Sequence, residues 1–482
     1  MKLLKLGALC LALVLALGCA GCGSSKEDTS YLDVESVTKI VDEGELHALK
    51  SYPNLKTLDI SGSTCYPAIM KFVEDCPQVD VTYTVTFGSQ TVSNKQTALT
   101  LTPEGWDFDT LHKQLRYLPN LTELTLSNTP LTPSQLDTIA KSYPRLTIAV
   151  SVDILGQEYP SDAQSVDLST LEPGQLDQVL EQLTLLPHLT QAELMDSSGA
   201  SKLSMTDVKK LMDAMPNVSF HYTFDLFGKS LSTADERVEY VKESIGNQGE
   251  EQIRQALDIM PNCTYFLLDS CGIDNEVMAS IREDYPNTKV VWRVTFGKYN
   301  ILTDAEVLRA VYNVYNKSSK DLRYCTDVKY IDMGHNEELS DISFIAHMPK
   351  LEICILSGSA ISDLSCFANC PNLEFLEIAY CGNLTDISPL ENCTNLRFLN
   401  ISFSKVEDLM PLDNLPLERF VYLNPKASRD EQEFFTAFHP DCWTRFTGSD
   451  PYTEGWRYDD SGKTFSEFYK KMQDIFGYKK MY

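Results

Sequence analysis

Few residues of this chain combine the types and the spacing that catalysis needs. His439, Asp441 and Cys442 lie together in FHPDCW, where a thiol and an imidazole could act as a nucleophile and its base. A Cys and a His three residues apart in sequence rarely face each other correctly. We therefore expect this segment to serve packing at the end of the chain.

Other arrangements that carry chemistry are absent from the sequence. Asp459, Asp460 and Glu467 form an acidic run without the Gly position and ligand periodicity of a calcium loop. There is no GxGxxG, Walker loop, HExxH or GxSxG, and the seven histidines have no ligand spacing. We expect no enzyme, no metal and no cofactor.

Charge excludes one broad class of partner. The 482 residues include 41 Lys and Arg against 68 Asp and Glu, which gives a formal net charge of -27. A protein that binds phosphates needs clustered cations, because counterion release supplies most of that affinity. We expect no nucleic-acid partner.

The N-terminal residues form a targeting segment. Lys2 and Lys5 precede an apolar stretch from Leu6 to Leu17, which is too short for a comfortable membrane span of about 20 residues. The run LALGCAGCGSS that follows resembles a bacterial lipobox, in which a Cys is diacylated and becomes the mature N-terminus. The resemblance implies a bacterial lipoprotein held by its lipid on the extracytoplasmic face of the cell membrane.

Two cysteines compete for the lipid. Cys22 follows Ala-Gly and precedes Gly-Ser-Ser, which is the more usual context, and Cys19 is the alternative. A plain secretory signal peptide is a further alternative. We predict a signal peptide over residues 1–22 and a flexible tether over 23–30.

A short repeat begins at Val328. The segments VKYIDMGHNEEL, LEICILSGSAI, LEFLEIAYCGNL and LRFLNISFSKV, with a degraded LERFVYLNP, match LxxLxLxxN/CxL. Between them lie DISFI, DLSCF, DISPL and DLMPL in the same register. These motifs resemble internalin-like leucine-rich repeats with an irregular or 3₁₀ convex side. The pattern predicts five repeats of about 22 residues over 325–424.

A longer period precedes these repeats. Strand-ending glycines recur at intervals of 68, 72 and 69 residues, at Gly88, Gly156, Gly228 and Gly297. Each unit is expected to contain a strand, a helix, a strand, a loop, a short strand and a helix. We predict four double leucine-rich repeats of about 70 residues over 53–324, with convex helices.

Together these periods predict an α/β fold, a leucine-rich repeat solenoid with a parallel concave sheet. One such repeat cannot bury its inward Leu row alone, so neighbours stack into a continuous core. Stacks of this kind need caps. We predict an N-terminal cap over 31–52 and a C-terminal cap, rich in aromatic residues, over 425–482.

Function is expected on the concave face, because alternate residues of each strand point away from the core. An apolar and aromatic column there is typical of a binding site. The alternative is that the column serves packing, either because the cap or a hairpin covers it or because the aromatic rings only pack on one another along the ladder of strands. The predicted contact residues are Tyr330, Ile353, Phe375, Glu377, Phe398, Asn400 and Arg419, with Tyr380 and Phe403 just beyond.

The cysteines fall at repeat positions that hold buried small residues. Cys370 and Cys393 occupy the same place in successive repeats, so they are expected to be near neighbours within disulfide range. We favour free buried thiols, because the repeat accepts Cys there as a small apolar residue.

The sequence as a whole therefore predicts a membrane-anchored surface protein that binds a protein partner of unknown identity. The resemblance to internalin-like repeats implies protein recognition by fold analogy. A structural lipoprotein that organises the envelope without a specific receptor is the alternative, and an enzyme acting through the C-terminal segment is a weaker one.

Overall fold

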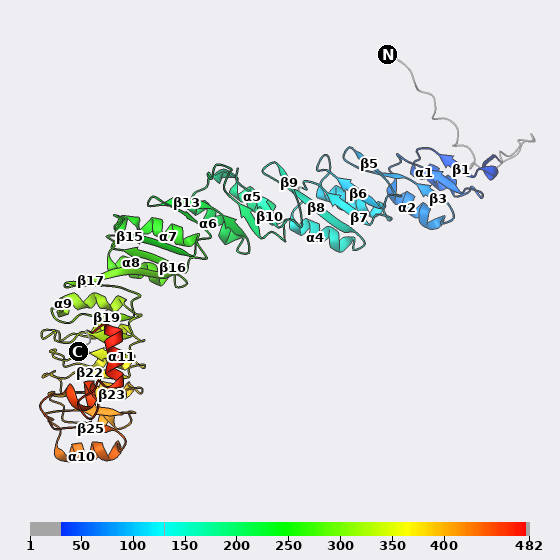
Figure 1. The fold of residues 1–482 in the computed structure, drawn as a ribbon. Coiled ribbons are helices and arrows are strands. Elements are labelled where there is room, and N and C mark those ends of the chain that lie inside the picture. The colour runs from blue at the N-terminus through cyan, green and yellow to red at the C-terminus, as the bar shows by residue number, and fades with distance from the viewer. Residues whose placement is uncertain (1–29, 130, 479–482) are drawn as a thin grey trace, which may run out of the picture. The chain divides into compact units, whose positions relative to one another are not determined.

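A computed structural model describes residues 30–129 and 131–478 (Figure 1). The predicted signal peptide, with Cys19 and Cys22, lies outside the described residues, as does the predicted tether up to residue 29.

The chain divides into two compact units. Unit 1 comprises Met1–Leu168 and Gly174–Gln191, and unit 2 comprises Ser169–Pro173 and Ala192–Tyr482. Each unit is a stack of strand-containing repeats.

Up to residue 183 the strands alternate with helices and hairpins in a recurring order. The elements are η1 (Ser30–Asp33), β1 (Ser36–Thr38), α1 (Glu43–Leu49), β2 (Thr57–Asp59), α2 (Tyr66–Asp75), β3 (Asp80–Thr82), β4 (Thr84–Phe87), β5 (Gln90–Ser93), β6 (Ala98–Leu101), α3 (Phe108–Gln114), η2 (Leu115–Tyr117), β7 (Glu123–Leu126), α4 (Pro133–Ser142), β8 (Thr147–Ile154), β9 (Gln157–Pro160), β10 (Ser165–Asp167), η3 (Pro173–Gln175) and α5 (Leu176–Leu183). Parallel pairing joins β1 to β2 and β2 to β3, and likewise β6 to β7 and β7 to β8.

The repeating glycines make the hairpin turns. In the hairpin of β8 and β9, Leu155 and Gly156 form the two-residue turn with φ values of 55° and 85°. Two successive positive φ values are the geometry that matches the right-handed twist of the paired strands, and glycine adopts it without a steric penalty. The same turn joins β13 to β14 at Phe227 and Gly228.

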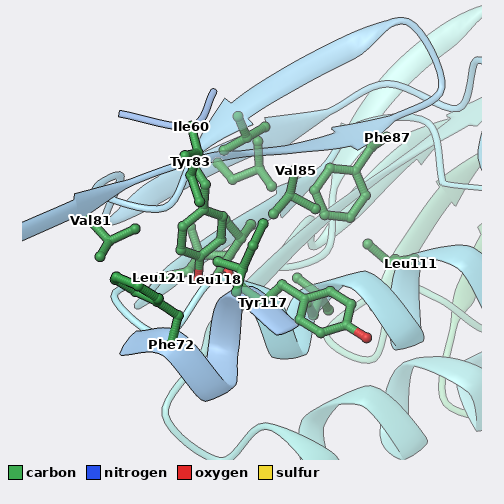
Figure 2. Close-up of a cluster of buried hydrophobic side chains, with 14 of the residues drawn as sticks. Ile60, Phe72, Val81, Tyr83, Val85, Phe87, Leu111, Tyr117, Leu118 and Leu121 are labelled. Atoms are coloured by element: carbon green, nitrogen blue, oxygen red, sulfur yellow. Dashed lines mark hydrogen bonds between the residues drawn. The ribbon is translucent and has the colours of Figure 1, made fainter. Parts of the chain in front are cut away.

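The core of unit 1 is a row of large apolar side chains between strands and helices (Figure 2). Tyr83 from the β3–β4 region is 1% exposed and meets Phe72 of α2. Its hydroxyl donates to the carbonyl of Tyr117 at 2.7 Å, so the one polar atom of the ring is satisfied. Burial raises the pKa of Tyr83 to about 12.

From residue 191 onward the same order continues and then changes. The elements are β11 (Gln191–Glu193), α6 (Met205–Ala214), β12 (Ser219–His221), β13 (Thr223–Leu226), β14 (Lys229–Ser232), β15 (Arg237–Val241), η4 (Asn247–Gly249), α7 (Glu250–Asp258), β16 (Tyr265–Asp269), α8 (Asn275–Asp284), β17 (Lys289–Phe296), β18 (Tyr299–Leu302), β19 (Val307–Arg309), α9 (Asn316–Ser319), η5 (Lys320–Tyr324), β20 (Tyr330–Asp332), η6 (Ser343–His347), β21 (Ile353–Ile355), η7 (Ser365–Asn369), β22 (Phe375–Glu377), η8 (Ser388–Asn392), β23 (Phe398–Asn400), η9 (Met410–Leu412), β24 (Arg419–Val421), α10 (Arg429–Phe438), β25 (Trp443–Arg445), the π-helix η10 (Thr453–Arg457) and α11 (Glu467–Phe476).

The convex side of unit 2 changes from α-helices to 3₁₀ helices where the repeat shortens. A repeat of about 22 residues leaves too few residues between strands for a full α-helix, which needs several turns. The recurring Asp of the convex motif fixes each 3₁₀ helix. Asp341, Asp363, Asp386 and Asp408 each accept a hydrogen bond from the backbone N–H two residues on, at 2.8 to 3.0 Å.

The N/C position of the LxxLxLxxN/CxL pattern, here called the ladder position, lies inside the stack, where it closes the turn after each strand. Asn336 is 2% exposed, donates to the carbonyls of Ala310 and Met333, and accepts from the N–H of Val314. One side chain thus joins two successive repeats. Cys381 occupies the same position and donates its thiol to the carbonyl of Leu356 at 3.7 Å.

Candidate functional site

The predicted concave residues form two straight rows on one sheet of unit 2. Parallel pairing in the order β19 to β25 aligns them residue by residue. The first row is Tyr330, Ile353, Phe375, Phe398 and Arg419. The second row is Asp332, Ile355, Glu377, Asn400 and Val421. The alternation of the strands therefore places these side chains on a common face, as expected.

The C-terminal segment of the same chain covers this face. In Figure 1 the red helix α11 lies over the strands of the seven-stranded sheet. The ring of Phe468 stacks on Phe398 with centroids 4.4 Å apart and on Phe375 at 5.1 Å. Phe375 and Phe398 are only 5% and 8% exposed. Of the two alternatives drawn from the sequence, the covered column is the one that the structure has.

Glu377 is the polar centre of this contact. Its carboxylate is 2% exposed and accepts from the indole N–H of Trp456 at 2.6 Å and from the Ser357 hydroxyl at 3.0 Å. The guanidinium of Arg457 lies at 3.2 Å. A buried carboxylate is tolerated only when donors replace its water, and removing the oppositely charged partner of such a group costs about 3–5 kcal/mol. The buried carboxylate of Glu377 therefore depends on hydrogen bonds from the C-terminal segment, and these bonds hold the segment on the sheet.

A second anchor lies where α11 ends. The Tyr478 hydroxyl donates to Asp332 at 2.8 Å, and the Arg309 guanidinium donates to the carbonyl of Phe476 at 2.9 Å. Burial raises the pKa of Asp332, and the neighbouring Glu377 carboxylate adds to that shift. Tyr478 also has a raised pKa, chiefly because it is buried.

Three more contacts hold the segment on the sheet. The side-chain amide of Asn400 donates to the carbonyl of Pro451 at 3.0 Å, and Arg419 donates to the carbonyl of Gly455 at 3.1 Å. Arg419 also pairs with Asp460 at 2.8 Å. Polar residues of the predicted site are therefore engaged by the segment from Pro451 to Tyr478.

A cavity of about 400 Å³ remains beside α11. It is lined by Phe375, Phe398, Glu418, Arg419, Trp456, Arg457, Asp459, Ser466, Glu467, Phe468, Tyr469 and Met472. Its charged walls are mostly paired within the chain, since Arg419 meets Asp460 and Arg457 meets Glu377.

Tyr380 and Phe403 belong to a further row that the sequence did not reveal as a whole. Three residues after each strand end, six successive repeats place a residue with positive φ, between 55° and 75°. We name this row the left-handed column: Tyr312, His335, Gly358, Tyr380, Phe403 and Asn424. For residues with a Cβ this backbone costs about 1–2 kcal/mol each.

Rings of the left-handed column stack in two pairs. Tyr380 and Phe403 have centroids 4.5 Å apart and planes within 5°, and Tyr312 and His335 lie at 5.2 Å and 17°. Tyr380 and Tyr312 remain 45% and 54% exposed. Tyr312 and His335 were missed in the sequence, although their position three residues beyond a strand was a usable signal.

The terminal residues that could have done chemistry are used in packing. His439 is buried and its ring stacks on Phe435 at 4.4 Å, while the Cys442 thiol donates to the carbonyl of Trp443. Burial raises the pKa of Cys442 to about 12, which disfavours the nucleophilic thiolate.

The carboxylates of the acidic run are likewise engaged by other residues of the chain. Asp459 accepts hydrogen bonds from Ser461 and Thr464 in a tight turn, and Glu467 pairs with Lys470 in the first turn of α11. Within residues 30–129 and 131–478 no group of three potential ligand side chains could hold a metal ion.

The eleven cysteines after residue 30 are free thiols in the structure. Cys370 donates to the carbonyl of Ile345 at 3.8 Å, and Cys393 donates to that of Phe367 at 3.5 Å. Burial raises the pKa of both thiols to about 12. They act as small core residues with weak donors.

Comparison with known proteins supports the fold. The family model "Leucine Rich repeats (2 copies)" matches residues 371–416. No curated protein matches the chain. Together with the strand register and the repeated ladder, this match confirms the predicted α/β leucine-rich repeat fold, with helices on the earlier convex side and 3₁₀ helices on the later one.

Solved structures of bacterial repeat proteins are similar at low identity. An internalin (inlF) of Listeria monocytogenes is 18% identical over 75% of this chain and 86% of its own, with a TM-score of 0.28. A leucine-rich repeat protein of Leptospira interrogans is 16% identical over 86% of this chain and 96% of its own, also with a TM-score of 0.28. In the described part of the chain, no helix has the length and apolar character to cross a membrane.

Proposed function

We propose that this protein is a binding scaffold that recognises a protein partner through the C-terminal repeats of unit 2. The observation that carries the proposal is that the concave face already holds a polypeptide segment by the means that protein interfaces use. Aromatic rings form the centre, and Glu377 is desolvated and matched by Trp456. Repeat solenoids in general present such extended faces to partners.

In this proposal the partner binds a surface that the C-terminal segment and the repeats form together. The segment stays in place, because it supplies donors to Glu377 and Asp332 and covers the rings of Phe375 and Phe398, which its departure would expose to water. A partner then contacts the outer side of α11, the exposed ring of Tyr380 and the partly buried ring of Phe403. The row from Tyr330 to Arg419 supports this surface from below.

The proposal places the protein on the extracytoplasmic face of a bacterial membrane. The support is the lipobox-like run, with Cys22 as the acylated residue and Cys19 as the alternative. Cells expressing the full chain with Cys22→Ser or Cys19→Ser are labelled with an alkyne fatty acid. Label lost only with Cys22→Ser supports the first site, label lost only with Cys19→Ser supports the second, and label on neither wild type nor variants contradicts the anchor.

Affinity capture tests the binding function. The chain from Ser24 to Tyr482 and its Tyr380→Ala variant are incubated with cell-surface protein extracts, and retained proteins are quantified by mass spectrometry. A protein retained by the wild type and depleted about tenfold or more with the variant supports the proposal. As a control, Met410→Ala truncates an exposed side chain on the convex side. Equal retention by all three chains favours the structural, envelope-organising alternative.

A further inference from the structure

The left-handed column contains a gap of one ring. Tyr312 stacks on His335, and Tyr380 stacks on Phe403, but Gly358 lies between the two pairs. Each ring pair spans one repeat, at 5.2 and 4.5 Å, close to the strand spacing of about 4.8 Å. His335 and Tyr380 are two repeats apart, so their facing sides are about 9–10 Å apart.

This gap has the thickness of one planar group. A ring or guanidinium stacks at about one strand spacing from each wall, as the pairs within the column do. A Cβ built on Gly358 would make ordinary contacts, at 3.6 Å from Cα and Nδ1 of His335, so one further atom fits there without a clash. The ring of Tyr452 has its centroid 6.0 Å from that of Tyr380 and its plane at 45°, and its hydroxyl interacts with Ser357, so this ring is not parallel to those of the column.

The surroundings favour a cationic guest. Glu337 and Glu338 are exposed in the turn that follows His335. Asp450 acts electrostatically on the hydroxyl of Tyr380. The cation Lys405 comes two residues after Phe403, and Phe403 is itself two repeats beyond Gly358. With a net charge of -27 on the whole chain, the approach of a basic segment is favoured.

We propose that His335, Gly358 and Tyr380 form a slot that receives an arginine side chain of the protein partner. A guanidinium is planar, cationic and weakly hydrated, so it stacks between two rings where a lysine ammonium cannot fill the plane. The chain uses the same contact internally, with Arg237 at 3.7 Å from the ring centroid of Tyr265 and Arg457 at 4.2 Å from that of Tyr452. This inference deepens the proposed function, because it names the side chain by which a partner would be held.

The test uses short peptides and needs no identified partner. Blocked Gly-Arg-Gly, Gly-Lys-Gly and Gly-Tyr-Gly are titrated into the chain from Ser24 to Tyr482 with isotope-labelled histidine. The imidazole signal of His335, assigned with His335→Gln, is followed by NMR. The arginine peptide is expected to shift this signal with an affinity at least about fivefold above that of the lysine peptide.

Two variants locate the binding. Gly358→Tyr fills the slot with a ring, which Tyr380 and Phe403 show to be compatible with this backbone, and is expected to abolish the shift. Gly382→Tyr adds the same ring outside the column, where nothing lies within 4 Å of a new Cβ, and is expected to bind as the wild type does. If Gly358→Tyr fails to fold, Tyr380→Ala removes one wall and is expected to weaken binding about tenfold.

Each other outcome overturns the inference. A stronger response to the tyrosine peptide means that the slot takes an aromatic side chain. No response to any peptide, or an equal response from Gly358→Tyr, means that the gap is not a binding site. Because the capture experiment reads retention of a whole partner, the proposed function can stand when the peptide test fails, and the slot can stand when capture fails.

Discussion

The indole N–H of Trp456 donates to the carboxylate of Glu377 at 2.6 Å, although the two residues are 79 positions apart. Both side chains are buried, at 5% and 2% exposure. A solenoid normally presents its concave sheet to solvent or to a partner. Here the residue at the centre of that sheet is satisfied by the chain's own C-terminal segment, so sheet and segment form one cooperative element.

Trp456→Phe is predicted to loosen the segment locally. The variant keeps an aromatic ring but leaves Glu377 without its shortest donor, at a cost of about 1.5–3 kcal/mol. Amide hydrogen exchange in residues 453–478 is expected to rise about 10- to 150-fold, measured by mass spectrometry on peptides from this region.

Trp443→Phe is the matched control for that change. Trp443 lies on the neighbouring strand β25 and also contacts the segment, at Gly455, but its indole bonds no carboxylate among the described residues. In Trp443→Phe, amide hydrogen exchange in residues 453–478 is expected to rise far less than in Trp456→Phe. Equal effects of the two variants would show that ring volume, and not the Glu377 bond, holds the segment.

Gly455→Ala is predicted to be more destabilising than Gly477→Ala. Both glycines have positive φ, at 76° and 62°, so both variants carry a backbone penalty of about 1 kcal/mol. A Cβ at 455 would also lie 2.0 Å from the Trp443 ring, whereas nothing lies within 4 Å at 477. Urea unfolding of the two variants measures the difference. An equal loss would mean that Trp443 moves aside without cost.

Asp332 is predicted to make unit 2 less stable as the pH rises. Because burial raises its pKa, the folded chain keeps the proton at pH values where the unfolded chain has lost it. Its contribution to the free energy of unfolding is complete below the unfolded-state pKa of about 3.9 and is lost as the pH rises through the folded-state pKa. Asp332→Asn lacks this loss, so its stability relative to wild type is expected to increase with pH.

Urea unfolding of wild type and Asp332→Asn from about pH 4 to about pH 8 checks the sign. A difference that stays constant with pH contradicts the prediction. Asp459→Asn supplies the opposite case, since hydrogen bonds from Ser461 and Thr464 lower the pKa of Asp459. The contribution of Asp459 is complete above the unfolded-state pKa of about 3.9 and is lost only as the pH falls below it, so from about pH 4 to about pH 8 the stability difference between Asp459→Asn and wild type is expected to stay constant.

Most of the fold could be predicted because repeats multiply weak signals. A single Asp, as in DISFI, does not predict a structural role, but four in the same register do. Each of the four accepts a backbone hydrogen bond that fixes a 3₁₀ helix. Alternation along the strands likewise placed Phe375 and Glu377 on one face. These features depend on neighbours in sequence or in the adjacent repeat.

The sequence offered the cover of that face only as an alternative, because the cover depends on one long-range contact that occurs once. Phe468, Met472 and Phe476 follow helical spacing, which signals an apolar helix face in need of a partner. The sequence of this helix does not indicate which surface its apolar face packs against. The left-handed column was not recognised as a row for another reason, since positive φ is uncommon at residues such as Tyr312 and Tyr380.

Tyr380→Asn is predicted to leave stability within about 1 kcal/mol of wild type while it removes partner binding. Asparagine tolerates the left-handed backbone, as Asn424 does in the same column, so about 1 kcal/mol of strain is relieved. That gain offsets the lost stacking on Phe403, worth about 0.5–1.5 kcal/mol. Phe375→Asn, at a buried ring of the same sheet, is expected to cost at least about 3–5 kcal/mol in urea unfolding. If Tyr380→Asn is as destabilising as Phe375→Asn, the ring at 380 serves the fold, and its strain needs no functional explanation.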